Sequence, residues 1–163
     1  MNFIKVLSEL EDSKEFKEWK KEHSLSYLTY GFMMISPDVK KEWQIGYYNP
    51  DLDKITTFAV SDEITRNPDS EIFKDKKKVQ ELEKDKVNIT LDSALEKADK
   101  IQKEKYSAHE PLKKIAILQK LNIGQVWNIT FITKTFKTLN IKVSSEDGEV
   151  LKYDLIDLFK FDK

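Results

Sequence analysis

Six polar side chains could form a binding surface, because each alternates with apolar side chains along a stretch with the pattern of a β-strand. They are Gln44, Tyr48, Asn128, Thr130, Thr138 and Asn140. Such alternation places polar and apolar side chains on opposite faces of a half-buried strand. Neighbouring amide and hydroxyl groups on one face can hydrogen-bond a peptide or a small polar ligand. The other interpretation, an ordinary solvated face rich in residues of high β-propensity, is the one that the pattern alone favours.

The aromatic side chains of the same stretches are a second candidate site. Trp43, Tyr47, Trp127 and Phe131 could line a ligand pocket. Large apolar side chains on an alternating strand usually form core, however. We therefore expect these four residues to be the inward-facing core residues of their sheets.

Residue types that carry catalysis or bind metals are sparse. The chain has no cysteine and only two histidines, His23 and His109, which excludes thiol chemistry, disulfides and a multi-histidine metal site within one chain. We expect both histidines to lie exposed on the surface. Four scattered glycines cannot form a Gly-rich phosphate loop. Residues 49–53 begin like a calcium loop, but Lys54 and Val60 stand where such a loop needs Gly and Glu. We expect no metal, no cofactor and no enzymatic activity.

The composition limits the classes of partner. The 163 residues are 39% hydrophobic and 35% charged, and the net charge is −1 because 28 basic residues nearly balance 29 acidic ones. Binding to nucleic acid or to an anionic membrane needs a basic surplus, so neither partner is expected. The longest apolar-rich run, 27–35, is shorter than the roughly 20 residues that span a bilayer. Acidic residues follow the N-terminus too soon for a signal peptide. We therefore expect a cytoplasmic protein.

The first half of the chain has the pattern of helices followed by a meander of strands. Helices are predicted over residues 2–11 and 13–22, the second capped by Asp12 with Glu15 completing a capping box. Strands are predicted over 25–36, 42–48 and 54–60. The first of these is so rich in apolar residues that we expect it to be buried on both faces, although a buried helix would have a similar pattern.

A charged segment, 62–86, follows the first meander. Its few apolar residues, Ile72, Phe73, Val79 and Leu82, are expected to hold it against the body of the protein. The alternative is a flexible tether.

The second half begins with a predicted short strand at Val87 and Ile89, after which Thr90 caps a helix with an apolar stripe. Strands are predicted over 114–121, 125–133, 136–143 and 149–153, the last two joined through the hairpin signal Asp147-Gly148. An apolar tail is expected to pack on the core; it contains Leu155, Leu158, Phe159 and Phe161.

The two halves share one order of elements, which indicates an internal duplication. Placing Trp43 on Trp127 without a gap also places Ile45 on Ile129 and Tyr47 on Phe131. Each half then reads as a helix, a strand, a Trp-x-Ile-x-aromatic strand and a further strand.

The second half resembles the PepSY domain. The matching residues are those of the helix start (89–98), the Trp-containing strand (125–129) and the Gly-containing hairpin (145–151). This resemblance implies a helix packed on an antiparallel sheet. Many members of that family are exported and attached to peptidases or sensors as inhibitory or ligand-sensing modules. The present sequence departs from that pattern, because it shows neither a signal peptide nor an attached enzyme, and the family supplies no catalytic residues.

These observations predict an α+β fold built from two helix-plus-antiparallel-meander units, PepSY-like or cystatin-like. The first unit would span 1–61, the charged linker 62–86 and the second unit 87–163. The predicted function is that of a non-catalytic module that binds a protein or peptide. The alternative is a carrier or sensor of a small ligand with a pocket between helix and sheet, and a third is an enzyme of unrecognised type.

Overall fold

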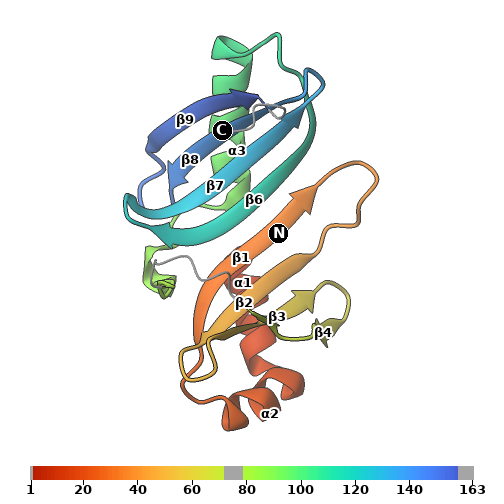
Figure 1. Ribbon diagram of the computed structural model, residues 1–163, viewed down its shortest axis with the longest axis vertical. Helices are drawn as coiled ribbons and strands as arrows, with labels where there is room; N and C mark the ends of the chain where they lie inside the picture. The colour runs from red at the N-terminus through yellow and green to blue at the C-terminus, as the bar shows by residue number, and fades with distance from the viewer. Residues whose placement is uncertain (1, 72–78, 158–163) are drawn as a thin grey trace.

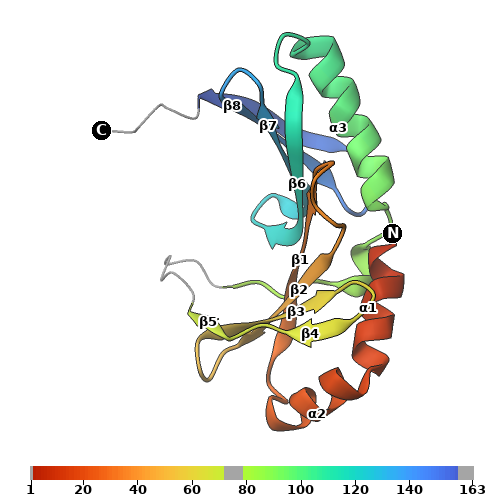
Figure 2. The same ribbon diagram turned by 90° about the vertical axis from the view of Figure 1, so that its right-hand side faces the viewer.

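Nine strands form one continuous antiparallel sheet, and three α-helices lie against one of its faces (Figures 1 and 2). The computed structural model describes residues 2–71 and 79–157, and these counts refer to them. Along the sheet the strands follow the order β4-β3-β2-β1-β6-β7-β8-β9, with β5 paired to β3. The predicted α+β class is confirmed.

The first half contributes two helices and five strands. They are α1 (Phe3–Asp12), α2 (Lys14–Glu22), β1 (Tyr27–Ile35), β2 (Trp43–Asn49), β3 (Lys54–Val60), β4 (Ile64–Arg66) and β5 (Ser70–Glu71). The predicted β1-β2-β3 meander is confirmed. The predicted cap of α2 is wrong, because Asp12 is the last residue of α1 and the Ser13 hydroxyl accepts the hydrogen bond from the Phe16 N–H at 3.2 Å. Ser13 is an equally suitable N-cap residue, so the sequence offered two adjacent candidates.

The second half contributes a short 3₁₀ helix, one α-helix and four strands. They are η1 (Lys84–Lys86), α3 (Leu91–Lys105), β6 (Pro111–Leu121), β7 (Gly124–Thr133), β8 (Lys137–Ser144) and β9 (Val150–Asp157). Thr90 caps α3 as predicted, accepting from the Ser93 N–H at 3.1 Å. The short strand predicted at Val87 and Ile89 is absent, since the N–H groups of Asn88 and Ile89 both donate to the Ser145 carbonyl instead.

β9 is longer than predicted and includes Leu155, which belongs to a strand rather than to an apolar tail. Leu158, Phe159 and Phe161 of the predicted tail lie outside the described residues, as do Ile72 and Phe73 of the charged segment. The predicted strand ended at Tyr153, next to the charged Asp154, but the backbone pairing with β8 continues to Asp157.

The last part of the charged segment, residues 79–83, passes between the two halves of the sheet and is held there. β1 and β6 pair from Tyr30 with Gln119 to Ile35 with Lys114, and they diverge beyond Gln119. Residues 79–83 run through this divergence, where the Leu82 N–H donates to the Leu28 carbonyl at 2.9 Å. The Leu82 side chain is only 4% exposed. Leu82 therefore attaches the segment to the core, as its apolar character predicted.

The core fills the space between the helices and the sheet. Its largest fully buried side chains include Trp43, Trp127, Phe58 and Phe131, and the two indole rings lie 6.0 Å apart between centroids. β1 is not buried on both faces as predicted. Its helix-side residue Met33 is 2% exposed, whereas Phe32 on the other face is half-buried.

Within the described residues, none of the helices has the length and apolar character needed to cross a membrane.

Candidate functional site

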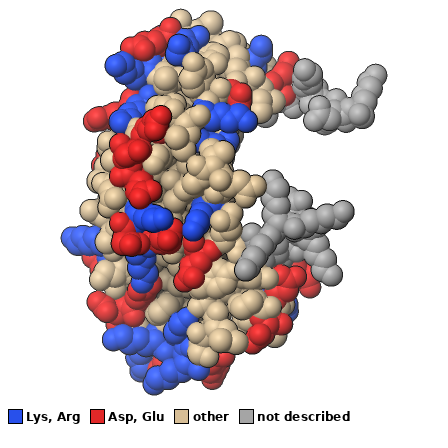
Figure 3. Space-filling model, turned by 90° about the vertical axis from the view of Figure 1, so that its left-hand side faces the viewer, with Lys and Arg blue, Asp and Glu red and all other residues tan. Residues whose placement is uncertain are grey.

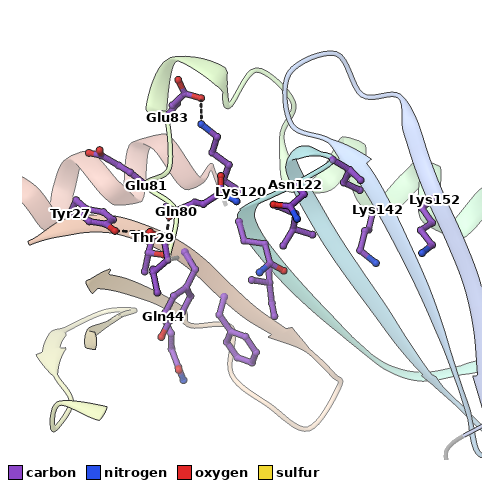
Figure 4. Close-up of a pocket in the computed structure, with 17 residues that line it drawn as sticks. Tyr27, Thr29, Gln44, Gln80, Glu81, Glu83, Lys120, Asn122, Lys142 and Lys152 are labelled. Atoms are coloured by element: carbon purple, nitrogen blue, oxygen red, sulfur yellow. Dashed lines mark hydrogen bonds and ion pairs between the residues drawn. The ribbon is translucent and has the colours of Figure 1, made fainter. Parts of the chain in front are cut away.

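The sheet is curved, and its concave face lies opposite the helices (Figure 2). On this face the surface is hollowed (Figure 3), and it contains a cleft of about 1280 Å³. The cleft extends over the seam between the halves, where β1 pairs with β6. Its lining comes from β1, β2, β6, β8, β9 and the segment 79–83 (Figure 4). The site therefore exists only where both halves of the chain meet.

The floor of the cleft is apolar at its centre. Phe32 of β1 lies directly opposite Ile117 of β6, and Tyr30 lies opposite Gln119 in the same register. These side chains alternate with the core residues Gly31 and Met33, so the pleat directs them to the uncovered face. All four lining side chains are half-buried, which leaves apolar surface available to a ligand.

The position of Tyr30 is fixed by a glycine on the neighbouring strand. Tyr30 lies opposite Gly46, and a Cβ atom at position 46 would overlap the Tyr30 ring. The Tyr30 hydroxyl reaches across β2 to the Thr57 hydroxyl of β3 at 2.7 Å. The ring therefore lies flat along the sheet and forms a rigid part of the floor.

One wall of the cleft is the segment 79–83 (Figure 4). The Tyr27 hydroxyl donates to the Val79 carbonyl at 2.6 Å, and the Thr29 hydroxyl donates to the Gln80 carbonyl at 3.1 Å. Burial, and then the charge of Glu81, raise the pKa of Tyr27 above its ordinary value.

The charges of that wall neutralise one another. Glu83 accepts from Lys120 at 3.1 Å and forms an ion pair with Lys86 at 3.2 Å. Hydrogen bonds from these two lysines hold the pKa of Glu83 below its usual range. Lys120 is therefore less available to a ligand than its place in the cleft indicates.

The opposite wall carries an unusual pair of cations. Lys142 of β8 lies directly opposite Lys152 of β9, and both side chains project to the same side of the sheet (Figure 4). Like charges in this arrangement are destabilising. The Lys142 ammonium donates to the Asn140 side-chain carbonyl at 2.5 Å, and within the described ranges it forms no ion pair with a carboxylate. The exposed Lys152 has Asp154 at 3.6 Å. This wall has a positive charge that is suited to an anionic group.

The polar residues predicted on β7 and β8 do lie side by side. The Asn140 side-chain amide donates to the side-chain oxygen of Asn128 at 2.6 Å and to the Thr130 hydroxyl at 3.0 Å. The Thr138 hydroxyl is 3.5 Å from the Ile156 carbonyl. These groups bond largely to one another, and none of the four lines the cleft.

The two predicted polar residues of β2 lie apart from each other. Gln44 lines the cleft next to Phe32. Tyr48 lies outside it and donates to the Asp53 carboxylate at 2.6 Å. Of the six predicted binding residues, the structure therefore brings Gln44 alone into the cleft, and their role in binding remains a prediction.

Sequence reasoning missed Tyr30, Phe32, Ile117 and the two lysines. The run 27–35 has too many apolar residues on both faces for alternation to identify its uncovered side. The alternation along this strand did indicate that Lys142 lies on the same polar face as Asn140. Its opposition to Lys152 depends on the β8–β9 register, which includes an irregularity at Lys142.

The predicted aromatic residues are core, as expected. Trp43, Tyr47, Trp127 and Phe131 are each at most 3% exposed. Ala94 and Ala98 of α3 are fully buried against the sheet, which allows close contact between helix and strands. The cleft therefore lies on the face opposite to the one where a carrier pocket between helix and sheet was expected.

The histidines are less exposed than predicted, and each is held separately. His23 stacks on Trp19 and its Nδ1 lies 2.8 Å from the Trp19 carbonyl, while Nδ1 of His109 lies 2.6 Å from the Thr135 hydroxyl. Both are half-buried. Within residues 2–71 and 79–157, no three His, Asp or Glu side chains are grouped so that they could hold a metal ion.

Comparison with known proteins gives a likeness of fold. No protein-family model and no curated protein sequence matches this chain. Among solved structures, the chain is similar to a crystal structure from Clostridium difficile 630 described as a putative lipoprotein. The TM-score is 0.57 at 14% identity, over 86% of this chain and 90% of that one. At this identity the similarity extends to the fold alone.

Proposed function

We propose that this protein is a non-catalytic binding module whose cleft holds an extended segment of a partner protein or peptide. The segment would carry a carboxylate beside apolar side chains. The observation that carries the proposal is the uncovered, hollowed sheet face, in which an apolar floor lies next to a cationic wall.

The dimensions of the cleft favour a polypeptide over a small ligand. Its volume of about 1280 Å³ exceeds the roughly 300–1,000 Å³ of typical small-molecule pockets. It also extends across the sheet from β1 to β9 rather than into the core. An extended segment matches such a shape, and its alternating side chains would reach the floor on one side only.

The positive charge of Lys142 and Lys152 would make the cleft selective for an acidic segment. Phe32 and Ile117 would contact its apolar side chains, while Lys142 would bind its carboxylate. An anion between Lys142 and Lys152 would also relieve the repulsion between them. A basic segment would be repelled from the same place.

Peptide display tests this proposal. An unbiased peptide library would be selected against the wild-type protein, and the enriched peptides measured against Lys142→Glu. We expect Asp or Glu beside apolar residues in these peptides, and binding to Lys142→Glu weaker by about tenfold or more. The matched control, Lys100→Glu, reverses a lysine with 74% of its side chain exposed on α3, on the opposite face. The proposal would be refuted if no peptide were enriched, or if the enriched peptides bound Lys142→Glu as tightly as they bind the wild type and Lys100→Glu.

We also infer that the fold is a tandem of two PepSY-like units. Two features support this inference: α1 precedes the β1-β2-β3 meander as α3 precedes β6-β7-β8-β9, and Trp43 and Trp127 both lie at the centre of the core. Sequences of relatives will test it. If the Trp-x-Ile pattern recurs at one of the two positions only, the duplication is wrong.

We propose separately that the protein is located in the cytoplasm. The composition favours the cytoplasm, whereas the similar structure is described as a putative lipoprotein. Fractionation of host cells with an antibody against the protein decides between these compartments, and recovery in the membrane or extracellular fraction would overturn the cytoplasmic proposal.

A further inference from the structure

The two ends of the described sheet are protected very differently. β4 ends one side with three residues, whereas β9 ends the other with eight, and β9 pairs with β8 alone among the described strands (Figure 1). A long edge strand presents unpaired backbone N–H and C=O groups that can pair with another strand, and proteins usually shorten or cover such edges. The β9 edge therefore needs an explanation.

Apolar side chains are unusually exposed along β9. Leu151, Tyr153 and Ile156 are 38%, 39% and 52% exposed. Three large hydrophobic residues on one eight-residue edge strand are typical of a strand that pairs with a partner.

We propose that β9 pairs antiparallel with β9 of a second copy of this chain, about a twofold axis through Tyr153. In this register Lys152 lies directly opposite Asp154 of the partner subunit, and Asp154 lies opposite the partner's Lys152. Opposite charges that face each other across two strands attract, and the symmetry produces the pair twice.

The charges select this register over its neighbours. An axis through Asp154 would place two aspartates opposite each other, and an axis through Lys152 would place two lysines there. Like charges directly opposite are destabilising. The sequence Lys-Tyr-Asp is therefore complementary to itself in one antiparallel alignment, which commits the surface to a second copy rather than to an unrelated strand.

The faces of the two sheets also match in this arrangement. Lys152 and Asp154 pair with Lys142 and Asn140 of β8 on the uncovered face. Tyr153 is on the helix side, where its ring meets Tyr106 at the end of α3 at 6.3 Å between centroids. A twofold axis perpendicular to the sheet keeps both sets of helices on one side. The two uncovered faces would then join into one surface.

Charge reversal with analytical ultracentrifugation tests the proposal. Asp154→Lys places a lysine opposite Lys152 of the partner subunit, and Lys152→Asp places an aspartate opposite the partner's Asp154. The wild type should be a dimer, and each single variant should weaken its association about tenfold or more, because two attractive pairs become repulsive. The double variant K152D/D154K restores opposite charges and should dimerise about as tightly as the wild type.

The matched control is the exchange Lys100→Glu with Glu104→Lys, an exposed pair on α3, which should leave dimerisation unchanged. Circular dichroism and thermal melting of each variant separate loss of association from loss of folding; both exchanged β9 side chains are about half exposed, at 59% and 47%. A monomeric wild type, or single variants that dimerise as well as the wild type, would overturn the proposal. A double variant as weak as the singles would also overturn it, because no attraction would have been restored.

The same measurements separate this proposal from the binding function. Lys142→Glu should weaken peptide binding without changing the dimer, whereas Asp154→Lys should dissociate the dimer. A dimer that persists in Lys142→Glu while peptide binding is lost would support both proposals independently.

Discussion

At the scale of single residues, the two central tryptophans differ in one hydrogen bond. Both are fully buried, and the Trp127 indole N–H donates to the Ile89 carbonyl at 2.9 Å. Among the described residues, the Trp43 indole N–H has no hydrogen-bond partner. A buried hydrogen bond stabilises a protein by about 0.5–1.5 kcal/mol, whereas an unbonded buried donor is a cost that removal relieves.

We therefore expect Trp127→Phe to lower the free energy of unfolding by about 1–2 kcal/mol more than Trp43→Phe does. The two substitutions remove the same ring volume, so the difference reports the hydrogen-bonding states of the two indole N–H groups, one bonded to Ile89 and one without a partner. Urea denaturation followed by circular dichroism measures both values. Equal losses in the two variants would contradict this prediction.

A second residue-scale prediction concerns Tyr48. Its hydrogen bond to Asp53, followed by desolvation and the Asp53 charge, raises its pKa from the ordinary value near 10 to about 12. Because the folded state holds this proton more tightly, its stabilisation is fully present below pH 10. It is lost as the pH rises from about 10 to about 12.

Asp53→Asn should return the Tyr48 pKa toward 10, since a neutral amide is a weaker acceptor than a carboxylate. Asn also tolerates the left-handed backbone of this position, where φ is 51°. Ultraviolet titration measures the shift, with Tyr48→Phe as the control that identifies the signal. An unchanged titration curve in Asp53→Asn would exclude the proposed cause.

At the scale of elements, Gln125 attaches the charged segment to the second half of the sheet. Its side-chain oxygen accepts from the Glu83 N–H at 2.8 Å, and its amide donates to the Glu83 carbonyl at 3.0 Å. The pair of bonds resembles those between two strands, and the side chain is only 7% exposed. The Gln125 side chain therefore gives the backbone N–H and C=O groups of Glu83 the hydrogen bonds that a neighbouring strand would otherwise provide.

Gln125→Leu should lower the free energy of unfolding by about 2–3 kcal/mol, because it leaves both backbone groups of Glu83 without partners. Gln119→Leu is the matched control. Gln119 is half-buried on the uncovered face and accepts one side-chain bond, from Asn128 at 2.9 Å, so its loss should cost about 1 kcal/mol or less. Chemical denaturation of both variants decides the point; a Gln125→Leu protein as stable as Gln119→Leu would contradict the attachment.

At the scale of the whole molecule, the β1–β6 pairing joins the halves into one sheet. Six residue pairs align between Tyr30 and Ile35 of β1 and the facing residues of β6. Phe3 of α1 contacts both central tryptophans, with ring centroids 5.1 Å from Trp43 and 6.2 Å from Trp127. The core is therefore shared between the halves.

We expect a single cooperative thermal transition, because neither half can lose its structure without exposing core surface of the other. Differential scanning calorimetry measures it, and the calorimetric and van't Hoff enthalpies should agree. Two resolved transitions would show that the halves unfold separately.

The sequence by itself determined the three α-helices and the long strands, together with the buried face of each strand whose polar and apolar residues alternate. Alternation identified Trp127, Ile129 and Phe131 as core and Asn128 and Thr130 as the outer face, because the pleat of a strand has a period of two. Local chemistry likewise located the cap at Thr90. Errors such as Asp12 in place of Ser13 arose where two neighbouring residues have similar capping ability.

Only the tertiary structure decided where the cleft lies. Phe32 and Ile117 are distant in sequence, and they form one floor because β1 pairs with β6. Lys142 and Lys152 face each other only through a register that includes an irregularity. Strand pairing and register are set by contacts between segments that are distant in sequence. Local sequence patterns do not specify which of several possible strands will pair with a given edge.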